Sequence, residues 1–460
     1  MSQWQATIQP REKRIRTFNE VSLGYSKRLV LEEAQRCPQC SHPPCAGDHG
    51  CPLGILIPRF IRFLREGKLQ DAYVEIANQN CFPSICGRIC SAPCEKACVL
   101  AKKENMAIPI RALERFAADF GKTRFKKQTL KRQGRKIAVV GSGPSGLTAA
   151  WALAKKGYDV VVFEALDQPG GILRYGVPEF RLPKKILDAE INDICALGVE
   201  IRTNCFVGKT ISLGEIFKEE FEAVLLTTGA GIAKMMDIPG VNLSGVYYGE
   251  EFLMRVNLMK TSIFSKTIPA FPIGQKIVVV GSGNTALDCA RSAVRFQKDV
   301  TLIFRRTEDE MKVRREECEY GKEEGVTIEP LIRPIEIVAD AHGHVAGLKC
   351  IRMDYADTSD NGVWDLLPVP DSEFLLNADT VILAIGHQPN SLITKIESSI
   401  KTNEDGTIWI DEKTGQTSYP SVFAAGNVVS NSGPLVFAMT SGVQAADNID
   451  HYLKAKSLLS

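Results

Sequence analysis

Apolar positions between about residues 52 and 120 recur at intervals of three and four, the spacing of one face of a helix. Two runs show this most clearly, IPRFIRFLREGKLQDAYVEIANQ and IRALERFAADF. The pattern predicts a helical first part of the chain. Residues 1–36 are mainly polar, and we interpret them as a lead-in to it.

A strongly basic stretch follows, GKTRFKKQTLKRQGRK at residues 121–136, with eight basic residues and almost nothing apolar. A docking patch is one interpretation. A solvated linker is favoured, because a run of like charges usually stays in water. This stretch is the best candidate for a domain boundary.

Beyond the boundary, short β-branched runs alternate with helical segments. The runs are KIAVVG, DVVVFE, AVLLTTG, KIVVVG, DVTLIF, TVILAIG and SVFAAG. This alternation is typical of parallel sheets joined by crossover helices. A strand, a glycine-rich loop and a helix follow one another at 137–156 and again at 277–296, which indicates a duplicated nucleotide-binding unit.

Length and composition narrow the class of protein. A chain of 460 residues has room for two or three domains, and 44% apolar residues is ordinary for a globular protein. The net charge of +2 gives no indication of nucleic acid or of a membrane surface as partner. The polar start lacks the apolar core of a signal peptide, and no apolar run is long enough to span a bilayer. We therefore expect a cytoplasmic location.

The first glycine-rich loop, GSGPSG, carries the pattern of a dinucleotide site. Gly141 permits the tight turn, Gly143 lets the backbone approach a pyrophosphate, and Gly146 allows close packing of helix on strand. Glu164 closes the next strand, where a carboxylate can bind the ribose hydroxyls. Because strand, helix and acid are all present, the loop predicts dinucleotide binding rather than a plain structural turn.

The second loop, GSGNTA, repeats the arrangement with Gly281, Gly283 and Ala286. The next strand ends in Arg305 and Arg306 instead of an acid. Paired guanidiniums favour a 2′-phosphate, so this unit is predicted to bind NADPH rather than NADH. Surface arginines at a strand end are the alternative.

Two further segments, GGILRYGVPEFRLPK and SVFAAGNVVSNSGPLVFAMTSGVQAA, resemble the flavin-binding segments of two-dinucleotide flavoprotein reductases. In that family a late strand–Gly–Asp motif holds the ribityl chain. This chain has Gly426 followed by Asn427, an amide without the charge. Together with the loops, the predicted cofactor-binding residues are Gly141, Gly143, Pro144, Ser145, Gly146, Glu164, Gly171, Ile172, Arg181, Gly229, Gly281, Gly283, Asn284, Thr285, Ala286, Arg305, Arg306, Gly386, Gly426 and Asn427.

Nine of the fourteen cysteines lie between Cys37 and Cys98. In a reducing compartment such a dense block more often binds metal than forms disulfides. The spacing matches neither the simple ferredoxin run nor the usual two-plus-two zinc pattern, so iron–sulfur clusters and zinc both remain open. No CxxC pair occurs after residue 100, so a redox-active disulfide beside a flavin is not indicated.

The segments GCPLGILIPRF, CSAPCEKACVL and FRRTEDEMKVRREE, with the duplicated loops, closely resemble the small (beta) subunit of NADPH-dependent glutamate synthase. Related chains include the flavin/iron–sulfur portion of dihydropyrimidine dehydrogenase and bifurcating NADPH:ferredoxin oxidoreductases. The resemblance covers nearly all of the chain after about residue 30. It implies an α/β fold: an N-terminal helical iron–sulfur domain followed by two Rossmann-like domains, for FAD and NADPH.

The resemblance also implies two interleaved [4Fe–4S] clusters. One set of ligands would be Cys37, Cys40, Cys45 and Cys98; the other would be Cys51, Cys90, Cys94 and Glu114. Five residues separate Cys45 from Cys51, where the family usually has three, and Cys81 and Cys86 fall where the family need not have cysteine.

The function implied is an electron-input subunit. It would pass hydride from NADPH to FAD and then single electrons through the clusters to a larger subunit that makes glutamate. No side-chain acid, base or nucleophile is nominated. The alternatives are the same module serving pyrimidine or ferredoxin reduction, a flavoprotein whose cysteine domain is stapled by zinc, and a binding protein with a degenerate FAD site. The expected domains are 1–120 for the clusters, 121–135 as linker, 136–272 with 387–460 for FAD, and 273–386 for NADPH.

Overall fold

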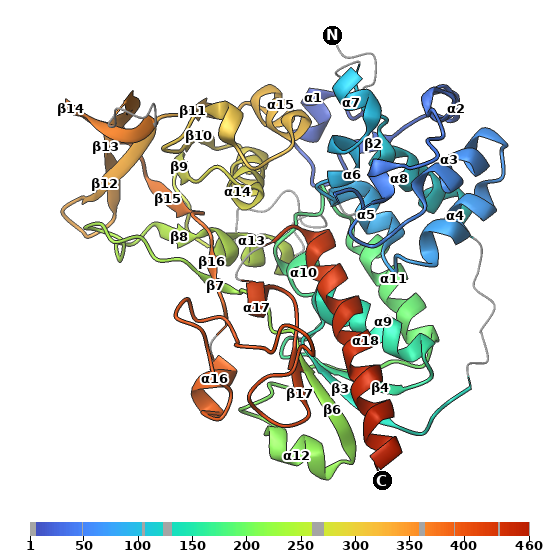
Figure 1. The fold of residues 1–460 in the computed structure, drawn as a ribbon. Coiled ribbons are helices and arrows are strands. Elements are labelled where there is room, and N and C mark those ends of the chain that lie inside the picture. Colours follow the sequence, from blue (N-terminus) through green and yellow to red (C-terminus); the bar gives the residue numbers. More distant parts are fainter. Residues whose placement is uncertain are drawn as a thin grey trace.

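The computed structural model describes residues 6–47, 49–103, 106–122, 131–259, 271–357, 364–390, 392–430 and 433–459. Most of the predicted basic linker, residues 123–130, lies outside these ranges. Figure 1 shows a helical N-terminal part at the upper right, a first parallel sheet at the bottom and a second one above it.

The N-terminal part is helical, as its apolar periodicity predicts. Its helices are short and are interrupted by prolines that stand at their first turns, a position where proline is tolerated. The elements are β1 (Thr7–Ile8), α1 (Arg11–Arg14), β2 (Ser22–Gly24), α2 (Lys27–Arg36), η1 (Pro44–Ala46), α3 (Ile57–Arg65), α4 (Leu69–Ala77), α5 (Pro83–Ile89), α6 (Pro93–Lys96), α7 (Val99–Lys103) and α8 (Ile110–Gly121).

The first five-stranded sheet has the order β17-β6-β3-β4-β5, and all its strands are parallel. Its strands are β3 (Lys136–Val140), β4 (Asp159–Phe163), β5 (Glu200–Arg202), β6 (Phe221–Leu226) and β17 (Val422–Ala424). The accompanying helices are α9 (Pro144–Lys155), α10 (Ile172–Tyr175), α11 (Lys184–Ala196), α12 (Leu213–Lys218), α17 (Asn427–Ser430) and α18 (Leu435–Leu459). Four strands are apolar along nearly their whole length, as expected where helices cover a sheet, whereas the edge strand β5 is polar at both ends.

The second sheet is also parallel and has the order β11-β10-β9-β15-β8. Its strands are β8 (Val246–Tyr248), β9 (Lys276–Val280), β10 (Asp299–Ile303), β11 (Thr327–Glu329) and β15 (Thr380–Leu383); with it come α13 (Gly249–Leu258), α14 (Asn284–Arg295), η2 (Glu308–Glu310) and α15 (Arg315–Glu324). The edge strand β8 precedes residue 273, where we expected this unit to begin.

Three smaller sheets complete the fold, of which one is the antiparallel pair β1–β2 of the N-terminal part. An antiparallel sheet of β12 (Ile332–Ala339), β13 (Val345–Asp357) and β14 (Trp364–Asn377) stands at the upper left of Figure 1. The pair β7 (Ile232–Ala233) and β16 (His387–Gln388) joins the two units, and α16 (Leu392–Ile396) follows it. The α/β class with parallel sheets is thus confirmed.

The N-terminal helices and the first sheet share one hydrophobic core. This core runs from Val30 through Phe82 and Leu147 to Leu453. The long helix α18 packs on α9 and also contacts α5 of the N-terminal part. The first half of the chain therefore completes its core only against the last helix.

Candidate functional site

The first glycine-rich loop connects β3 to α9, and its glycines are needed where they stand. Gly141 has φ +102°, and a Cβ there would lie 2.7 Å from the carbonyl oxygen of Thr227. A Cβ on Gly146 would lie 2.0 Å from the carbonyl oxygen of Gly141. Around Gly143, by contrast, there is open space. The loop thus leaves room for a ligand at its second glycine, as dinucleotide loops do.

Glu164 stands at the end of β4 beside this loop and is 6% exposed. Its Oε2 accepts a hydrogen bond from the backbone N–H of Ser142 at 3.0 Å, and its Oε1 accepts one from that of Leu166 at 2.9 Å. The hydroxyl of Ser142 also donates to this carboxylate. The carboxylate is therefore fixed at the strand end, where a ribose would lie.

Ser145, in the first turn of α9, has a buried hydroxyl without a hydrogen-bond partner among the described residues. A buried polar group without a partner is costly, and a pyrophosphate at a helix N-terminus would satisfy it. A Cβ on Gly426 would lie 2.8 Å from Ser145 Cβ, and the N–H of Gly426 donates to Ser441 Oγ of α18 at 2.9 Å. Pro144 and Asn427 begin α9 and α17, so the structure brings the early loop and the late segment together.

The segment from Gly170 to Leu182 lies against the first glycine-rich loop. A Cβ on Gly171, at φ +51°, would lie 2.8 Å from Gly143 Cα, so only glycine permits this approach. Ile172 follows at the start of α10 and is 49% exposed. Arg181 reaches from this segment to α14, where its Nη1 donates to Asp288 Oδ2 at 2.7 Å. The first unit and the second are thus in contact through an ion pair.

The second glycine-rich loop, between β9 and α14, repeats the geometry. A Cβ on Gly281 would lie 2.2 Å from the carbonyl oxygen of Ala384, whereas Gly283 borders open space. Asn284, Thr285 and Ala286 form the first turn of α14.

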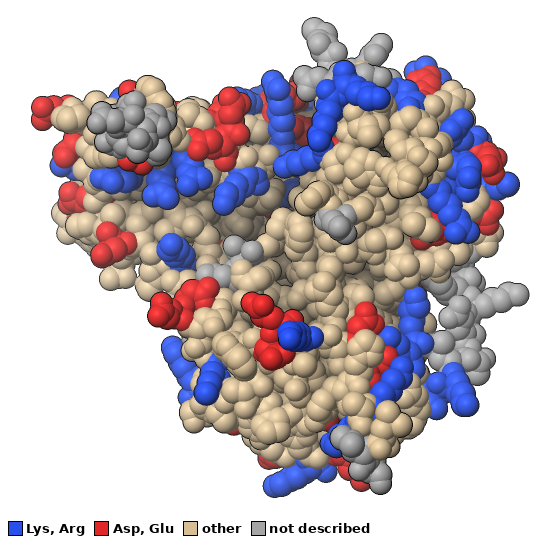
Figure 2. All heavy atoms as spheres, in the orientation of Figure 1, with Lys and Arg blue, Asp and Glu red and all other residues tan. Residues whose placement is uncertain are grey.

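The arginines that follow β10, Arg305 and Arg306, are both exposed. Gly229 and Gly386 both have positive φ and open surroundings, and they lie close to the β7/β16 pair that joins the two units. Figure 2 shows a hollow between the lobe with the second sheet and the rest of the molecule, with Lys and Arg along its upper rim.

Two of the cysteines, Cys45 and Cys94, have pKa values that are raised by the charges of different neighbouring thiols. In the first group, that of Cys45, burial raises the pKa of this thiol to about 12, and thiolate charge at Cys98, Cys37 and Cys40 adds to this effect. Cys37, Cys40 and Cys45 are half-buried and Cys98 is buried. Cys37 Sγ accepts a hydrogen bond from Gln39 Nε2 at 3.4 Å.

The second group comprises Cys51, Cys90, Cys94 and Glu114. Burial is the first cause that raises the pKa of Cys94, and the charges of Glu95, Cys51, Cys90 and Glu114 follow it. Burial also raises the pKa of Glu114 to about 8. The same charges reach beyond the four ligands implied by the resemblance, because Glu95 acts on Cys94 and both Cys90 and Glu114 act on Cys86.

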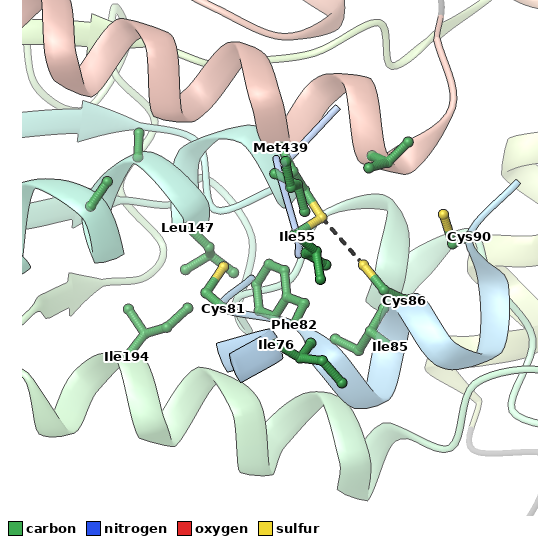
Figure 3. Packing of buried hydrophobic residues seen from close by; sticks show 14 of the residues in the cluster. Ile55, Ile76, Cys81, Phe82, Ile85, Cys86, Cys90, Leu147, Ile194 and Met439 are labelled. Carbon is green, nitrogen blue, oxygen red and sulfur yellow. Dashed lines mark hydrogen bonds between the residues drawn. The ribbon is translucent and has the colours of Figure 1, made fainter. Parts of the chain in front are cut away.

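Cys81 and Cys86 lie in the hydrophobic core together with Cys90, Cys94 and Cys98. Cys86 Sγ lies 3.7 Å from Met439 Sδ of α18, and Cys81 Sγ lies 3.3 Å from Thr148 Oγ1 of α9. Figure 3 shows Cys86 pointing toward Met439 while Cys90 lies to one side. The contact of Cys86 joins α5 to α18, and that of Cys81 joins the residues before α5 to α9.

Over the described part of the chain, no three His, Cys, Asp or Glu side chains are placed to hold a single metal ion. Thiolates are nevertheless the donors that iron–sulfur clusters use, and charge effects on pKa link Cys45 to Cys37, Cys40 and Cys98, and Cys94 to Cys51, Cys90 and Glu114. Backbone N–H donation to sulfur is also present, from Ala92 to Cys90 Sγ at 3.4 Å. In the same ranges no helix is long and apolar enough to cross a membrane.

Sequence patterns identified the glycine-rich loops but not the residues that hold them in place by hydrogen bonds. Ser142, Thr227 and Ser441 hold Glu164, the first loop and Gly426 through hydrogen bonds. Ser142 lies within the loop motif and could have been nominated from its position. Ser441 could not, because it is 15 residues from its partner on another element.

The fold and the two loops define a two-dinucleotide flavoprotein, with one Rossmann-like unit for each dinucleotide. Residues 135–448 match the family described as pyridine nucleotide-disulphide oxidoreductase. Residues 14–125 match the one described as dihydropyrimidine dehydrogenase domain II, 4Fe-4S cluster. The chain belongs to the pyridine nucleotide-disulphide oxidoreductase family, in the branch that contains the glutamate synthase small chains.

Among its relatives, the small chain of NADPH glutamate synthase from Azospirillum brasilense is 33% identical over 97% of this chain and 94% of its own length. The Escherichia coli small chain is 31% identical over 95% of this chain and 94% of its own length. The beta subunit of the NADP(+)-dependent formate dehydrogenase of Moorella thermoacetica is 34% identical over 88% of this chain, which spans only 59% of that subunit.

Among solved structures, Mycobacterium tuberculosis FprA in complex with NADPH has a TM-score of 0.58 and 18% identity, over 71% of this chain and 86% of that one. This likeness shows the fold. The family matches and the relatives identify an NADPH-dependent FAD oxidoreductase that carries a 4Fe–4S domain and transfers electrons.

Proposed function

We propose that this chain is the electron-input subunit of a glutamate synthase, with FAD, NADPH and two [4Fe–4S] clusters bound at the positions described above. The observation that carries the proposal is a 4Fe–4S-type domain with nine cysteines between Cys37 and Cys98, joined to a duplicated dinucleotide-binding unit. The domain division given above, 1–120, 136–272 with 387–460, and 273–386, belongs to the same proposal, except that β8 and α13 lie with the second sheet although they precede residue 273. The cytoplasmic location is also part of it.

When bound, FAD takes two electrons from NADPH as hydride, and the clusters accept electrons one at a time. The residues of the chain hold and orient these groups. Glu164 binds the adenosine ribose of FAD, Ser145 and the N-terminus of α9 bind its pyrophosphate, and Gly426 leaves room for the ribityl chain. Arg305 and Arg306 bind the 2′-phosphate of NADPH. Neither site requires a general acid or base from the protein.

The proposed ligands of one cluster are Cys37, Cys40, Cys45 and Cys98, and those of the other are Cys51, Cys90, Cys94 and Glu114. The second set is more buried than the first, and two of its members, Cys90 and Glu114, act by charge on Cys86, whose Sγ contacts Met439 of α18. We therefore propose that electrons reach the second set before the first. The half-buried first set would then be the point of exit to a partner.

The glutamate synthase large subunit is the proposed partner, because small chains named for that enzyme match this chain over 94–95% of their own length. A second candidate is the same module serving another acceptor. It is favoured by the similarity to the formate dehydrogenase beta subunit and to the putative oxidoreductase AegA of Escherichia coli, of which this chain spans 59% and 69%.

The first test is the content of iron, acid-labile sulfide, zinc and flavin in anaerobically purified protein, followed by NADPH addition. We expect about eight iron and eight sulfide per FAD, the content of two four-iron clusters, and bleaching of the flavin bands. Zinc without sulfide would contradict the electron-transfer role and support the zinc-stapled alternative. A flavin that NADPH does not bleach would contradict the assignment of NADPH as the hydride donor.

Single substitutions then test the ligand sets. Cys45→Ser and Cys94→Ser should each remove about four iron per FAD, since each affects a different cluster. Cys195→Ser is the matched control, because Cys195 is a half-buried thiol on α11 outside both groups. Equal iron content in Cys94→Ser and the control would refute the second set.

A further inference from the structure

A cavity of about 90 Å³ lies where the N-terminal part, the segment before α11 and the second sheet's helices meet. Its lining is unusually rich in arginine. The charged residues around it are Arg88, Arg111, Arg115, Arg181, Arg291, Arg314, Glu20, Glu95, Glu316 and Glu317. The cavity is about three times the volume that one water molecule takes in the liquid, so it can hold more than a single water.

Arginines from three separate parts of the chain meet at this cavity. Arg111 lies on α8, Arg181 lies in the segment between α10 and α11, and Arg314 directly precedes α15. Glu316 and Glu317 lie among these arginines, Glu95 acts on Arg111, and Asp288 pairs with Arg181. Arg111, Arg181, Arg291 and Arg314 together hold the pKa of Glu317 well below its usual range, so this carboxylate stays ionised.

Several guanidinium donors at the cavity have no hydrogen-bond acceptor among the described residues. They are Arg111 Nε, Arg181 Nε and Arg314 Nη1. The side chain of Arg181 is only 8% exposed, and its Nε is 3.8 Å from Glu317 Oε2. Arg314 Nη1 is 3.1 Å from Glu316 Oε1 but is not aligned for a hydrogen bond. Buried donors normally have partners, so these three indicate an acceptor that the protein itself does not supply.

The carboxylates already present are occupied. Glu317 accepts from Arg291 through one oxygen and from Arg314 through the other, the latter at 2.8 Å. Glu316 Oε1 accepts from Arg111 Nη2 at 2.5 Å. Arg88 and Arg115 are paired with Glu20 at 2.7 and 2.8 Å. The unused donors therefore come from the three arginines that belong to different parts of the chain.

We propose that this cavity is a binding site for a small oxyanion, a phosphate or a carboxylate, whose oxygens accept from Arg111, Arg181 and Arg314 at once. Guanidinium groups bind such planar or tetrahedral oxyanions through charge-assisted hydrogen bonds. Because the three arginines come from three parts of the chain, the bound anion ties these parts together. Anion concentration then controls how firmly the NADPH-binding unit is held against the iron–sulfur domain.

This site is separate from the dinucleotide sites. None of the loop glycines lines the cavity, and neither do Arg305, Arg306 or any proposed cluster ligand; of the predicted cofactor-binding residues only Arg181 does. The inference therefore does not rest on the partner or on the number of clusters. It rests on the cavity and its unused donors.

The test is calorimetric titration of the full-length, anaerobically purified protein with inorganic phosphate and, separately, with acetate. Saturating NADP⁺ is present throughout, so that the 2′-phosphate site is already filled. We expect one saturable site per chain and a rise in the thermal unfolding midpoint with anion concentration. The tighter of the two anions identifies the source, phosphate or carboxylate.

Two variants locate the site. Arg314→Gln removes a donor and should weaken binding about tenfold or more, the range of a charge-assisted hydrogen bond. Ala112→Leu adds bulk to the lining without changing its charge and should also weaken binding. Arg28→Gln is the control, since Arg28 is exposed and pairs only with Glu32 on α2.

Absence of saturable binding in the native protein would mean that only water fills the cavity, and it would overturn the proposal. So would binding that is equally strong in Arg314→Gln, Ala112→Leu and Arg28→Gln, because the anion would then lie elsewhere. If Arg314→Gln fails to fold, Ala112→Leu alone decides.

Discussion

Glu190 of α11 is a buried acid that supports a helix of another part of the chain. It is 2% exposed, and its carboxylate accepts from the backbone N–H groups of Ser84 and Ile85 at 2.6 and 3.3 Å. These are orphan donors at the start of α5. Burial outweighs the hydrogen bonds and raises the pKa of Glu190 to about 7.

Because folding raises the pKa of Glu190, the free energy of unfolding should fall as pH rises. The folded protein holds the Glu190 proton up to about pH 7, whereas an unfolded chain releases it near pH 4.5. The stability that Glu190 contributes is therefore fully present below about pH 4.5, its pKa in the unfolded chain. It is lost as pH rises through about 7, its pKa in the folded protein. Between about pH 6 and about pH 8 the loss should be about 1 kcal/mol, and Glu190→Gln should remove it.

Thermal unfolding at the two pH values, at one scan rate, measures this difference. Glu404→Gln is the control, because Glu404 is exposed on a loop. If Glu190→Gln keeps the full pH dependence of the native protein, Glu190 is not its source.

Arg305 and Arg306 determine coenzyme choice in our proposal. Replacing both by alanine removes charge-assisted bonds to the 2′-phosphate, each worth about 1.5–3 kcal/mol. The KM for NADPH should rise at least about tenfold while the KM for NADH stays nearly constant. Steady-state flavin reduction with each coenzyme measures both values. An equal rise for the two coenzymes would mean that the arginines do not contact this phosphate.

At the scale of elements, the crossing of α18 over α9 shapes the flavin site. Gly442 lies at the crossing, and a Cβ there would lie 2.3 Å from the carbonyl oxygen of Ser145. Gly442→Ala must therefore push α18 away from the loop that binds pyrophosphate. We expect the purified variant to lose most of its FAD, measured by the ratio of flavin to protein absorbance.

The matched control is Gln444→Ala, a change to the same residue type at an exposed position on the same helix. It should keep its flavin. Full flavin in both variants would show that the helices separate without affecting the site.

Elements with a strong local signal could be predicted from the sequence, and those without one could not. The strand at Lys136–Val140 and its glycine loop combine an apolar run with turn residues, so their place follows from local rules. Strand β14 carries Pro368 and Pro370 and mostly exposed side chains, which hide its strand character. It lies at the edge of its sheet, where proline is tolerated.

In the candidate site, too, residues of a local motif could be predicted from the sequence and contacts between distant residues could not. The glycines and Glu164 belong to one short motif, whereas the pair Arg111–Glu316 joins residues 205 positions apart. No local pattern indicates that two such residues meet, because their contact depends on how the two units pack. The arginine-lined cavity could therefore be found only in three dimensions.

At the scale of the whole molecule, the N-terminal helices and the first sheet have one core. Phe82 is fully buried within it, near Cys86 and Leu147 (Figure 3). Phe82→Ala should lower the free energy of unfolding by about 3–5 kcal/mol. Because the core is shared, two changes on heating should shift together to a lower temperature. They are the rise in flavin fluorescence as its quenching is lost and the loss of cluster absorbance.

A variant in the core of the second sheet is the comparison. Ile382→Ala removes a fully buried side chain from a different core cluster. It should destabilise by about 2–5 kcal/mol without first releasing the clusters. If Phe82→Ala shifts only one of the two signals, the N-terminal part and the flavin unit unfold independently.

The contact between α5 and α18 has a consequence for how the protein is made. A ribosome makes the N-terminal helices before α18, so the cysteine-bearing part leaves the exit tunnel without the helix that completes its core. Its buried thiols stay accessible until α18 has also emerged. Cluster insertion is therefore expected to precede closure of the core, and a stop codon before α18 would yield a chain that cannot retain its iron.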